Sequence, residues 1–233
     1  MKLSIIIPVY NEERTLEKVI KAVEAVGLPC EKEIIFIDDN STDRSRKILS
    51  NYANKYKVLL MDKNQGKGAV LRRGFAEATG DIVLVQDADL EYNPQDYPAL
   101  ISPIANGEVD VIYGSRFIKG EKTSENKIIY KRGYLFSRFL NNMSNILSGI
   151  YLSDMYTCYK VFSKSSIDKI YPLLKSNRFG FDPEVTALVA KFNFKIKEVP
   201  ISYSGRTYEE GKKINWKDGV AAIFHIIRFN LFK

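Results

Sequence analysis

The sequence predicts an α/β protein with a mostly parallel central sheet and helices on both of its faces. Through the first half of the chain, short apolar runs rich in β-branched residues alternate with longer segments whose apolar residues recur at helical spacing. The connections between them are short, as in strand–helix–strand units. Right-handed crossovers then bring the carboxyl ends of the strands to one edge, where such sheets bind ligands.

Each expected element follows from a local pattern. A buried strand is expected at residues 3–7, which are mostly isoleucine, and a helix at 12–26, which ends before Gly27 and Pro29. The alternation continues with strands at 33–37, 58–61, 81–85 and 109–113, and with helices at 43–56, 67–78 and 94–105. In the less regular second half, helices are expected at 129–147, 183–192 and 217–232, strands at 158–163 and 195–200, and polar loops at 118–126 and 207–215.

These elements predict one domain at residues 1–213, followed by an amphipathic helix at 214–233 that packs on the domain or lies at a membrane surface. The chain has 233 residues, 45% apolar and 27% charged, which excludes disordered, collagen-like and disulfide-scaffold proteins. Cys30 and Cys158 lie far apart without metal-ligand spacing, which is typical of a protein from a reducing compartment. The single histidine, His225, argues against histidine-based catalysis and against a histidine metal site.

The net charge of +7 points to an anionic partner: nucleic acid, a phosphorylated small molecule or an anionic membrane surface. Surface solubility is the alternative explanation for the same excess. No membrane-spanning helix is expected, because charged residues interrupt the longest apolar stretches, at 128–150 and 219–232. The N-terminal apolar run is too short, and too soon followed by acidic residues, for a signal peptide.

Two aspartates, Asp87 and Asp89, directly follow the apolar strand at 81–85. Residues two apart in an extended chain point to the same side, roughly 6–7 Å apart, so both carboxylates project together from the end of a central strand. Glu91 continues the series. Mg²⁺ and Mn²⁺ take such oxygen ligands and bridge to substrate phosphates, so these three residues are the candidate metal ligands. A solvated acidic turn is the alternative interpretation.

Other predicted strand ends also carry polar residues. Asp39 ends the second strand, where a carboxylate accepts hydrogen bonds from a ribose or a base, although this segment also has helix-capping residues. Tyr10 and Glu12 follow the first strand, where they are placed to stack on a base and to reach a hydroxyl. The glycines on either side of Lys67 precede a helix, and they allow an anion to approach the backbone at its N-terminus.

A set of short motifs occurs along the chain in a defined order, at residues 8–12 (PVYNE), 38–43 (DDNSTD), 64–68 (NQGKG), 87–89 (DAD), 114–116 (GSR), 154–160 (DMYTCYK), 179–184 (FGFDPE) and 198–206 (EVPISYSGR). The set resembles the family-two inverting glycosyltransferases, which have the GT-A (Rossmann-like) fold. Its later segments are similar to the polyprenyl-phosphate branch of that family, typified by dolichyl-phosphate mannosyltransferase. The resemblance covers about residues 3–213.

The resemblance implies a nucleotide-sugar donor, a lipid-phosphate acceptor and a divalent metal ion, Mg²⁺ or Mn²⁺. By resemblance, the donor is bound by Pro8, Tyr10, Glu12, Asp39, Lys67, Asp87, Arg206 and Lys213. The metal is bound by Asp87, Asp89 and Glu91, and the acceptor phosphate by Arg116, Arg132 and Ser137. The candidate catalytic residues are Asp87, Asp89, Arg116 and Asp154, with Asp154 near the transferred sugar.

The implied reaction moves a hexose from GDP-mannose or a UDP-hexose to a polyprenyl phosphate, such as dolichyl or undecaprenyl phosphate. That acceptor is already anionic near neutral pH, so it needs positioning more than a general base. A glycosyltransferase of the same fold acting on a glycan hydroxyl in cell-envelope polysaccharide synthesis would need a base, with Asp154 or Glu184 as candidates. A non-catalytic nucleotide-sugar-binding protein is the third hypothesis. Nucleic acid is not expected as a partner, because the Asp87/Asp89 pair would repel its backbone.

A polyprenyl phosphate lies in a membrane, which gives two segments a second interpretation. Residues 130–147 and the C-terminal helix mix basic with aromatic and aliphatic residues, a pattern typical of helices at a membrane surface. The alternative is that both helices cap the sheet. We therefore expect a cytoplasmic protein, peripherally associated with the inner face of the membrane. The sequence leaves open a small membrane protein as an additional partner.

Overall fold

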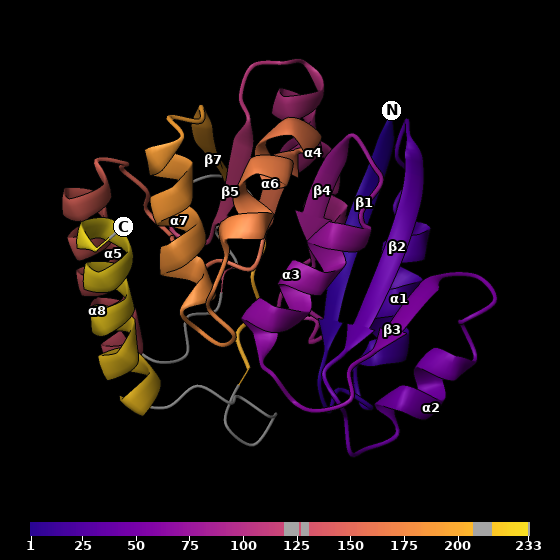
Figure 1. Cartoon of the computed structure of the whole chain (residues 1–233). Helices are drawn as coiled ribbons and strands as arrows, with labels where there is room; N and C mark the ends of the chain where they lie inside the picture. Colours follow the sequence, from indigo (N-terminus) through magenta and orange to yellow (C-terminus); the bar gives the residue numbers. More distant parts are fainter. Residues whose placement is uncertain (119–125, 127–130, 207–215, 233) are drawn as a thin grey trace.

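A seven-stranded sheet forms the centre of the molecule in the computed structural model, which describes residues 1–118, 126, 131–206 and 216–232 (Figure 1). Its strand order is β3-β2-β1-β4-β6-β5-β7. The strands are β1 (Lys2–Val9), β2 (Glu31–Asp38), β3 (Lys57–Leu60), β4 (Ile82–Val85), β5 (Val111–Ser115), β6 (Lys160–Ser163) and β7 (Ile196–Pro200).

Helices cover both faces of this sheet, as the sequence predicts. The α-helices are α1 (Leu16–Ala25), α2 (Ser45–Ser50), α3 (Lys67–Glu77), α4 (Tyr97–Ala105), α5 (Lys131–Ser148), α6 (Lys164–Ile170), α7 (Phe181–Lys191) and α8 (Trp216–Leu231). Among the described residues, the 3₁₀ turns η1 (Pro94–Asp96) and η3 (Tyr171–Leu173) lie beside α4 and α6. In the view of Figure 1, α3 and α6 lie in front of the sheet.

Every strand and most helices occur where the sequence predicts them, and two differences have local causes. The helix expected at 43–56 is reduced to α2, and turns follow it. Asn51 and Asn54 lie in that stretch, and asparagine side chains compete with the helical backbone for hydrogen bonds. Helix α6 was not expected. Ser163 begins it, because its side chain accepts a hydrogen bond from the Ser166 backbone N–H.

The mostly parallel arrangement is confirmed, and the exception is β6. It pairs antiparallel with both of its neighbours, through Val83 opposite Phe162 on the β4 side and Ile112 opposite Val161 on the β5 side. The β1–β2, β1–β4, β2–β3 and β5–β7 pairs are all parallel. The carboxyl ends of β1, β2 and β4 therefore meet at one edge.

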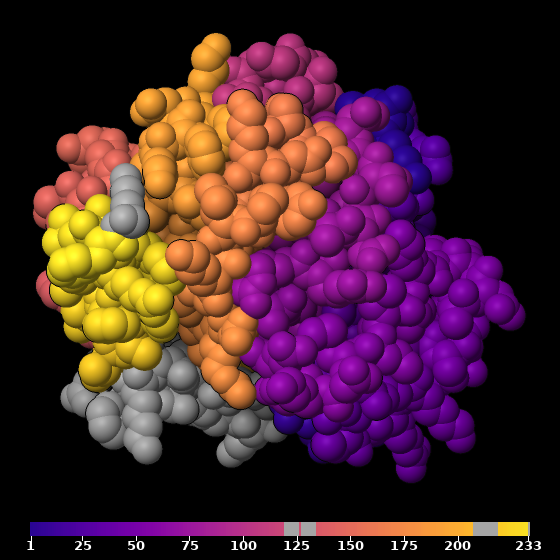
Figure 2. All heavy atoms as spheres, in the orientation of Figure 1, coloured from indigo at the N-terminus to yellow at the C-terminus, as the bar shows by residue number. Residues whose placement is uncertain are grey.

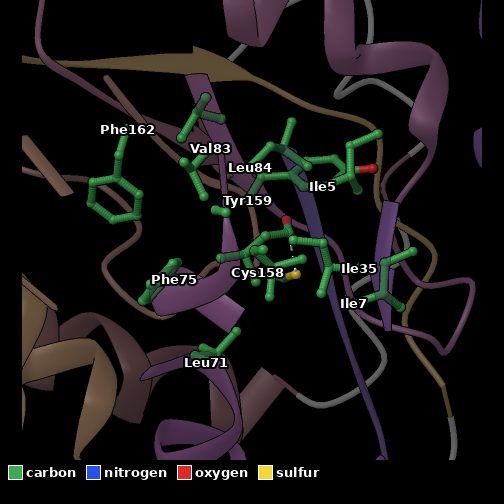
Figure 3. Close-up of a cluster of buried hydrophobic side chains, with 14 of the residues drawn as sticks. Ile5, Ile7, Ile35, Leu71, Phe75, Val83, Leu84, Cys158, Tyr159 and Phe162 are labelled. Atoms are coloured by element: carbon green, nitrogen blue, oxygen red, sulfur yellow. Dashed lines mark hydrogen bonds between the residues drawn. The ribbon is translucent and has the colours of Figure 1, made fainter. Parts of the chain in front are cut away.

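The core lies between the sheet and its helices. All four residues of β4 are buried, as expected for a central strand covered on both faces. Figure 3 shows part of this core, with Leu71 and Phe75 of α3 beside residues of the sheet. Helix α3 approaches β1 closely because Gly74 has no side chain: a Cβ there would lie 2.4 Å from the Cγ2 atom of Ile6.

Helices α5 and α8 pack together at one side of the molecule, and α8 also contacts α7 (Figure 1). Leu140 and Met155 form a second, small core with Ala222 and Ile226 of α8. The outer surface of the two helices keeps large apolar side chains exposed, namely Leu135, Phe136, Phe139, Ile146, Val220, Phe224 and Leu231. Within the described residues, no helix is long and apolar enough to cross a membrane.

The Glu33 carboxylate joins β2 to the turn between α3 and β4, and this gives a test of the fold. It accepts hydrogen bonds from the backbone N–H and hydroxyl of Thr79, both at 2.8 Å, and from the Ser4 hydroxyl. Burial opposes its ionisation, but these hydrogen bonds and Lys2 lower its pKa to about 2. We expect Glu33→Gln to reduce the free energy of unfolding by about 1–3 kcal/mol at pH 7. The NH₂ group of the glutamine would face hydrogen-bond donors where the carboxylate now accepts from them.

The pH dependence of that difference follows from the lowered pKa. The contribution of Glu33 is complete above its ordinary pKa of 4.5 and is lost as the pH falls towards 2. Denaturant titrations of wild type and Glu33→Gln should therefore converge between those two values. Glu31→Gln is the control, because that side chain on the same strand is exposed. A difference that stays constant with pH would contradict this role of the carboxylate.

Candidate active site

A cavity of 760 Å³ opens at the carboxyl ends of β1, β2 and β4. It brings together residues that lie far apart in the sequence. The predicted site residues on its wall are Pro8, Tyr10, Glu12, Asp39, Lys67, Asp87, Asp89, Glu91, Arg116 and Arg206. The topology explains this gathering, because the carboxyl ends of neighbouring parallel strands share one edge.

Two of the described site residues, Asp154 and Ser137, are not on this wall. Asp154 is buried behind it, and Ser137 lies on α5 outside the residues that line the cavity. Arg132 lies in α5, but its side chain is not among the described ones, and Lys213 lies outside the described residues.

The carboxylates at the cavity are held by cations from other elements. Lys67, at the first position of α3, contacts the Asp87 carboxylate at 2.6 Å. The Arg206 guanidinium contacts Asp89 at 2.7 Å, Glu12 at 3.3 Å and Glu91 at 3.4 Å. Arg206 therefore joins the segment after β7 to the loops that follow β1 and β4.

The acidic residues perturb each other's pKa. Burial, together with the nearby charges of Asp87 and Glu91, raises the pKa of Asp89 to about 7. Burial also opposes ionisation of Asp87, but the Lys67 ammonium prevails and lowers the pKa of Asp87. The same ion pair raises the pKa of Lys67 despite its burial. This acidic cluster has more negative charge than the neighbouring side chains easily compensate. The excess negative charge favours a bound cation.

The donor set fits a hard divalent cation at Asp87 and Asp89, because both offer carboxylate oxygens inside the cavity. Glu91 is placed differently from the third ligand that the sequence predicts. Its two oxygens accept hydrogen bonds from the Arg206 backbone N–H at 2.9 Å and from the Tyr203 hydroxyl at 3.2 Å. Across the described part of the chain, no three histidine, cysteine or acidic side chains converge as a metal site.

Arg116 is held firmly on the cavity wall by Asp154. The Asp154 carboxylate accepts hydrogen bonds from the guanidinium Nε and Nη2 atoms, both at 2.7 Å, and from the Arg116 backbone N–H at 3.1 Å. The guanidinium also lies over the rings of Phe117 and Tyr203, at 5.2 and 5.0 Å. Sequence reasoning places Asp154 beside the transferred sugar. In the structure its carboxyl group is fully buried and paired with Arg116, and its position relative to a sugar stays a prediction.

A second carboxylate supports Asp154 in turn. Glu198 of β7 accepts hydrogen bonds from the backbone N–H groups of Ser153 and Asp154, at 2.8 and 3.0 Å, and from the Ser153 hydroxyl. Burial raises the pKa of Glu198. Arg116 is thus fixed through two layers of part-buried hydrogen bonds, from β7 to the 153–154 backbone and from there to the guanidinium.

Asp39 lies on the cavity wall, and its carboxylate also organises the loop before α3. It accepts hydrogen bonds from the backbone N–H groups of Gln65 and Gly66, at 2.8 and 2.7 Å. Its neighbour Asp38 is buried and pairs with Arg46 at 2.6 Å. Asp39 therefore connects the end of β2 with the residues that lead to Lys67.

The segment before α7 and the first turn of that helix contribute cavity residues to which sequence reasoning gives no role, namely Arg178, Phe179 and Asp182. The segment is fixed on α3. The Arg72 guanidinium donates to the Ser176 carbonyl oxygen at 2.6 Å, and the Ala69 backbone N–H donates to that of Asn177 at 3.2 Å. The sequence signal that could have found these residues is the FGFDPE motif, which the resemblance already includes.

This packing gives the glycines around Lys67 a different role from the one predicted. Gly66 has a φ of +92°, and a Cβ on Gly68 would lie 2.3 Å from the Ser176 carbonyl oxygen. These glycines therefore make room for the 176–178 backbone, in addition to any ligand at the helix N-terminus.

We expect Gly68→Ala to displace the segment that carries Arg178 and Phe179. The added methyl group cannot fit beside backbone atoms, so the free energy of unfolding should fall by about 1–3 kcal/mol. Nucleotide binding should weaken as well, which calorimetry measures. Gly27→Ala is the matched control, because a Cβ there meets nothing within 4 Å. Unchanged stability and binding in Gly68→Ala would contradict the close approach of these two segments.

Comparison with known proteins agrees with this geometry. The sequence profile described as glycosyl transferase family 2 matches residues 4–171. The α/β fold and this match define the protein as a glycosyltransferase. The chain belongs to glycosyl transferase family 2, as the resemblance of its motifs predicts.

Several curated relatives match most of the chain. Dolichol-phosphate mannosyltransferase of Pyrococcus furiosus is 31% identical over 91% of this chain and 59% of its own length. Undecaprenyl-phosphate 4-deoxy-4-formamido-L-arabinose transferase of Enterobacter is 27% identical over 91% of this chain and 62% of its own length. The chain therefore spans about three fifths of these two relatives. An uncharacterized protein of Methanocaldococcus jannaschii is 26% identical over 99% of this chain and 93% of its own length.

Solved structures share the fold. Glucosyl-3-phosphoglycerate synthase from Mycobacterium tuberculosis, in complex with Mn²⁺, UDP and glucosyl-3-phosphoglycerate, has a TM-score of 0.67 and 20% identity. The match covers 98% of this chain and 80% of that one. The same enzyme with Mg²⁺ and UDP has a TM-score of 0.66. At this identity the likeness shows a common fold alone.

Proposed function

We propose that this glycosyltransferase moves a hexose from a nucleoside-diphosphate sugar, either GDP-mannose or a UDP-hexose, to a polyprenyl phosphate. The observation that carries the proposal is one cavity that holds both the Asp87/Asp89 pair and a rigidly fixed arginine, Arg116. The Asp87/Asp89 pair suits a metal-bound diphosphate, and Arg116 suits a phosphate nucleophile. Curated relatives named as dolichol-phosphate and undecaprenyl-phosphate transferases support this choice of acceptor.

In this proposal the donor lies along the ends of β1, β2 and β4. Pro8, Tyr10, Glu12 and Asp39 bind the nucleoside, while Lys67, Arg206 and Lys213 bind the diphosphate. Asp87 and Asp89 would hold Mg²⁺ or Mn²⁺, which neutralises the charge on the leaving diphosphate. Structures of the same fold with Mn²⁺ or Mg²⁺ and UDP support a divalent ion at this edge.

The acceptor side of the proposal rests on Arg116, joined by Arg132 and Ser137. The guanidinium N–H groups of Arg116 that are not donated to Asp154 bind the acceptor phosphate and aim one of its oxygens at the anomeric carbon. Asp154 acts through Arg116 as a positioning residue. Acceptors with a hydroxyl nucleophile are less well supported, because both predicted bases are buried and engaged. Asp154 pairs with Arg116, and Glu184 accepts hydrogen bonds from the Lys175 and Ser176 backbone.

We further propose that residues 1–213 form the catalytic domain and that the helix at 214–233 helps it to associate peripherally with the cytoplasmic face of a membrane. The exposed apolar side chains of α5 and α8 support this placement, because they face away from the core that the two helices share. Basic residues such as Arg138 and Arg228 accompany them, and anionic lipid headgroups attract such residues.

The direct test is to incubate the protein with a panel of nucleotide sugars and a short polyprenyl phosphate, and to identify products by mass. The expected product is a sugar that is joined to the lipid through a phosphate. A sugar linked to a glycan hydroxyl, or no transfer with any donor, would contradict the proposal. Thermal unfolding gives an independent check, since GDP or UDP should raise the melting temperature only when Mg²⁺ or Mn²⁺ is present. Equal stabilisation without metal would count against a metal-bound diphosphate.

A further inference from the structure

A second cavity, of 540 Å³, lies beside the first. Three separate segments line it: residues 63–65 after β3, residues 176–178 with Gly180 before α7, and His225 of α8. Figure 2 shows these parts of the molecule meeting at one face, where orange surface lies between the yellow surface of α8 and the purple N-terminal half. The two cavities share Asn64 and Arg178, so they adjoin at those side chains.

The second cavity is positively charged. Lys63 and Arg178 line it, and no carboxylate is among the described residues on its wall. On the wall of the first cavity, Lys67, Arg116 and Arg206 all have carboxylate partners within 3.4 Å. Arg178 differs from them within the described chain, since its side-chain hydrogen bond goes to the neutral Asn64 amide oxygen, at 3.3 Å. Its charge is therefore available to an anion.

Two buried polar atoms at this cavity lack partners. The Ser176 Oγ and His225 Nδ1 atoms are buried and make no hydrogen bond. They flank one point, because a Cβ built on Gly180 would lie 2.7 Å from the first and 2.9 Å from the second. Buried polar groups normally have partners, since leaving one unpaired costs free energy. Only a glycine fits between these two atoms, and both belong to residues that line the cavity.

The backbone adds to the same field. Helix α7 has 11 residues and begins directly after Gly180, which provides no side-chain cap. The N-terminus of a helix carries partial positive charge, which Asp182 and Glu184 in the first turn of α7 offset in part. The His225 ring is held in place by stacking on Phe229, with 9° between the ring planes. Burial, and next the charge of Arg228, lowers the pKa of His225, so its ring is neutral at pH 7.

We propose that this second cavity binds a phosphoryl group, with Arg178 and Lys63 providing the charge, and with Ser176 and His225 providing hydrogen-bonding atoms. The inference goes beyond the proposed reaction, because Lys63, Ser176 and His225 line the second cavity and not the first, and Arg178 is the one proposed phosphoryl ligand that the two cavities share. The phosphoryl group belongs either to a soluble phosphate or to the headgroup of an anionic lipid. In both cases Arg178 adjoins the first cavity, so we expect binding of the phosphoryl group to affect that cavity as well.

The single histidine of the chain makes a direct test practical. Its imidazole proton signals in an NMR spectrum belong to His225 without further assignment. We expect inorganic phosphate, added at constant pH and ionic strength against sodium chloride, to shift these signals saturably. Arg178→Gln and Ser176→Ala should each weaken that binding about tenfold, because each removes a direct partner. Arg44→Gln, at an exposed arginine distant in the fold, is the matched control and should bind as wild type.

Vesicles distinguish the two sources of the phosphoryl group. Co-sedimentation with phosphatidylcholine vesicles that contain phosphatidic acid, but not with phosphatidylcholine alone, would assign the site to a lipid headgroup if Arg178→Gln abolishes it. Saturable binding of inorganic phosphate without such co-sedimentation would assign it to a soluble ligand. The proposal is overturned if chloride shifts the His225 signals equally, if the shifts do not saturate, or if both variants bind phosphate and vesicles as wild type does.

Discussion

Asp89→Asn is expected to reduce sugar transfer by about 10²–10³-fold or more while leaving the protein folded. The substitution removes one of the two carboxylates that would hold the divalent ion, and it removes the strongest contact of Arg206. Both changes weaken the stabilisation of the leaving diphosphate. The fold should survive, because a neutral asparagine avoids both the burial of a charge and the repulsion from Asp87 and Glu91, which together raise the pKa of Asp89 to about 7.

The measurement combines three readouts on the same preparation. Transfer is followed by product mass, Mn²⁺ binding by calorimetry in the absence of donor, and folding by thermal unfolding. We expect transfer and Mn²⁺ binding to be lost together, with a melting temperature equal to or above that of wild type. Asp62→Asn changes an exposed aspartate outside the cavity and should leave all three unchanged. Full activity in Asp89→Asn would remove this residue from the mechanism.

Asp154→Asn is expected to have the largest effect on stability, a loss of about 3–5 kcal/mol in the free energy of unfolding. The Asp154 carboxylate is fully buried, and the Arg116 side chain is 15% exposed. Neutralising the acid leaves a guanidinium with little access to water and without its counter-charge. Burial of an unpaired charge is among the most costly changes that a single substitution can make.

A double-mutant cycle separates this structural effect from catalysis. Arg116→Met with Asp154→Leu removes both charges, so we expect it to be markedly more stable than Asp154→Asn alone. As Asp154 positions Arg116, its substitution should raise the KM for the polyprenyl phosphate more than that for the nucleotide sugar. An equal rise in both, or a stable Asp154→Asn with unchanged kinetics, would contradict the positioning role.

The strands and the acidic edge were predictable because their signals are local. A run such as Ile82–Val85 is apolar at every position, which a central strand requires. Asp87 and Asp89 come directly after it, and any parallel sheet brings such positions to the ligand-binding edge. The family motifs also include other residues that line the cavity, namely Pro8, Tyr10, Glu12, Asp39, Lys67 and Arg116.

Features that depend on contacts between distant segments were not predictable. Nothing near Gly68 in the sequence indicates that its partner is the backbone of Ser176. Likewise, the burial of Asp154 depends on Arg116 and on Glu198, which lie on either side of it in the chain. Aspartate is usually exposed, so a position near the substrate was the natural expectation from sequence. The burial of Asp154 and its pairing with Arg116 come from contacts across segments, which the sequence alone does not show.

The antiparallel strand β6 lies between β4 and β5 in the sheet, and this place affects how the chain can fold during translation. Strands β1 to β4 are contiguous both in the chain and in the sheet, so they can pair as soon as they leave the ribosome. Strand β5 cannot join them, because both of its neighbours, β6 and β7, come from the last third of the chain. Until then both edges of β5 remain open to other nascent chains. A stalled ribosome complex that ends before β6 should therefore be the form most in need of a chaperone.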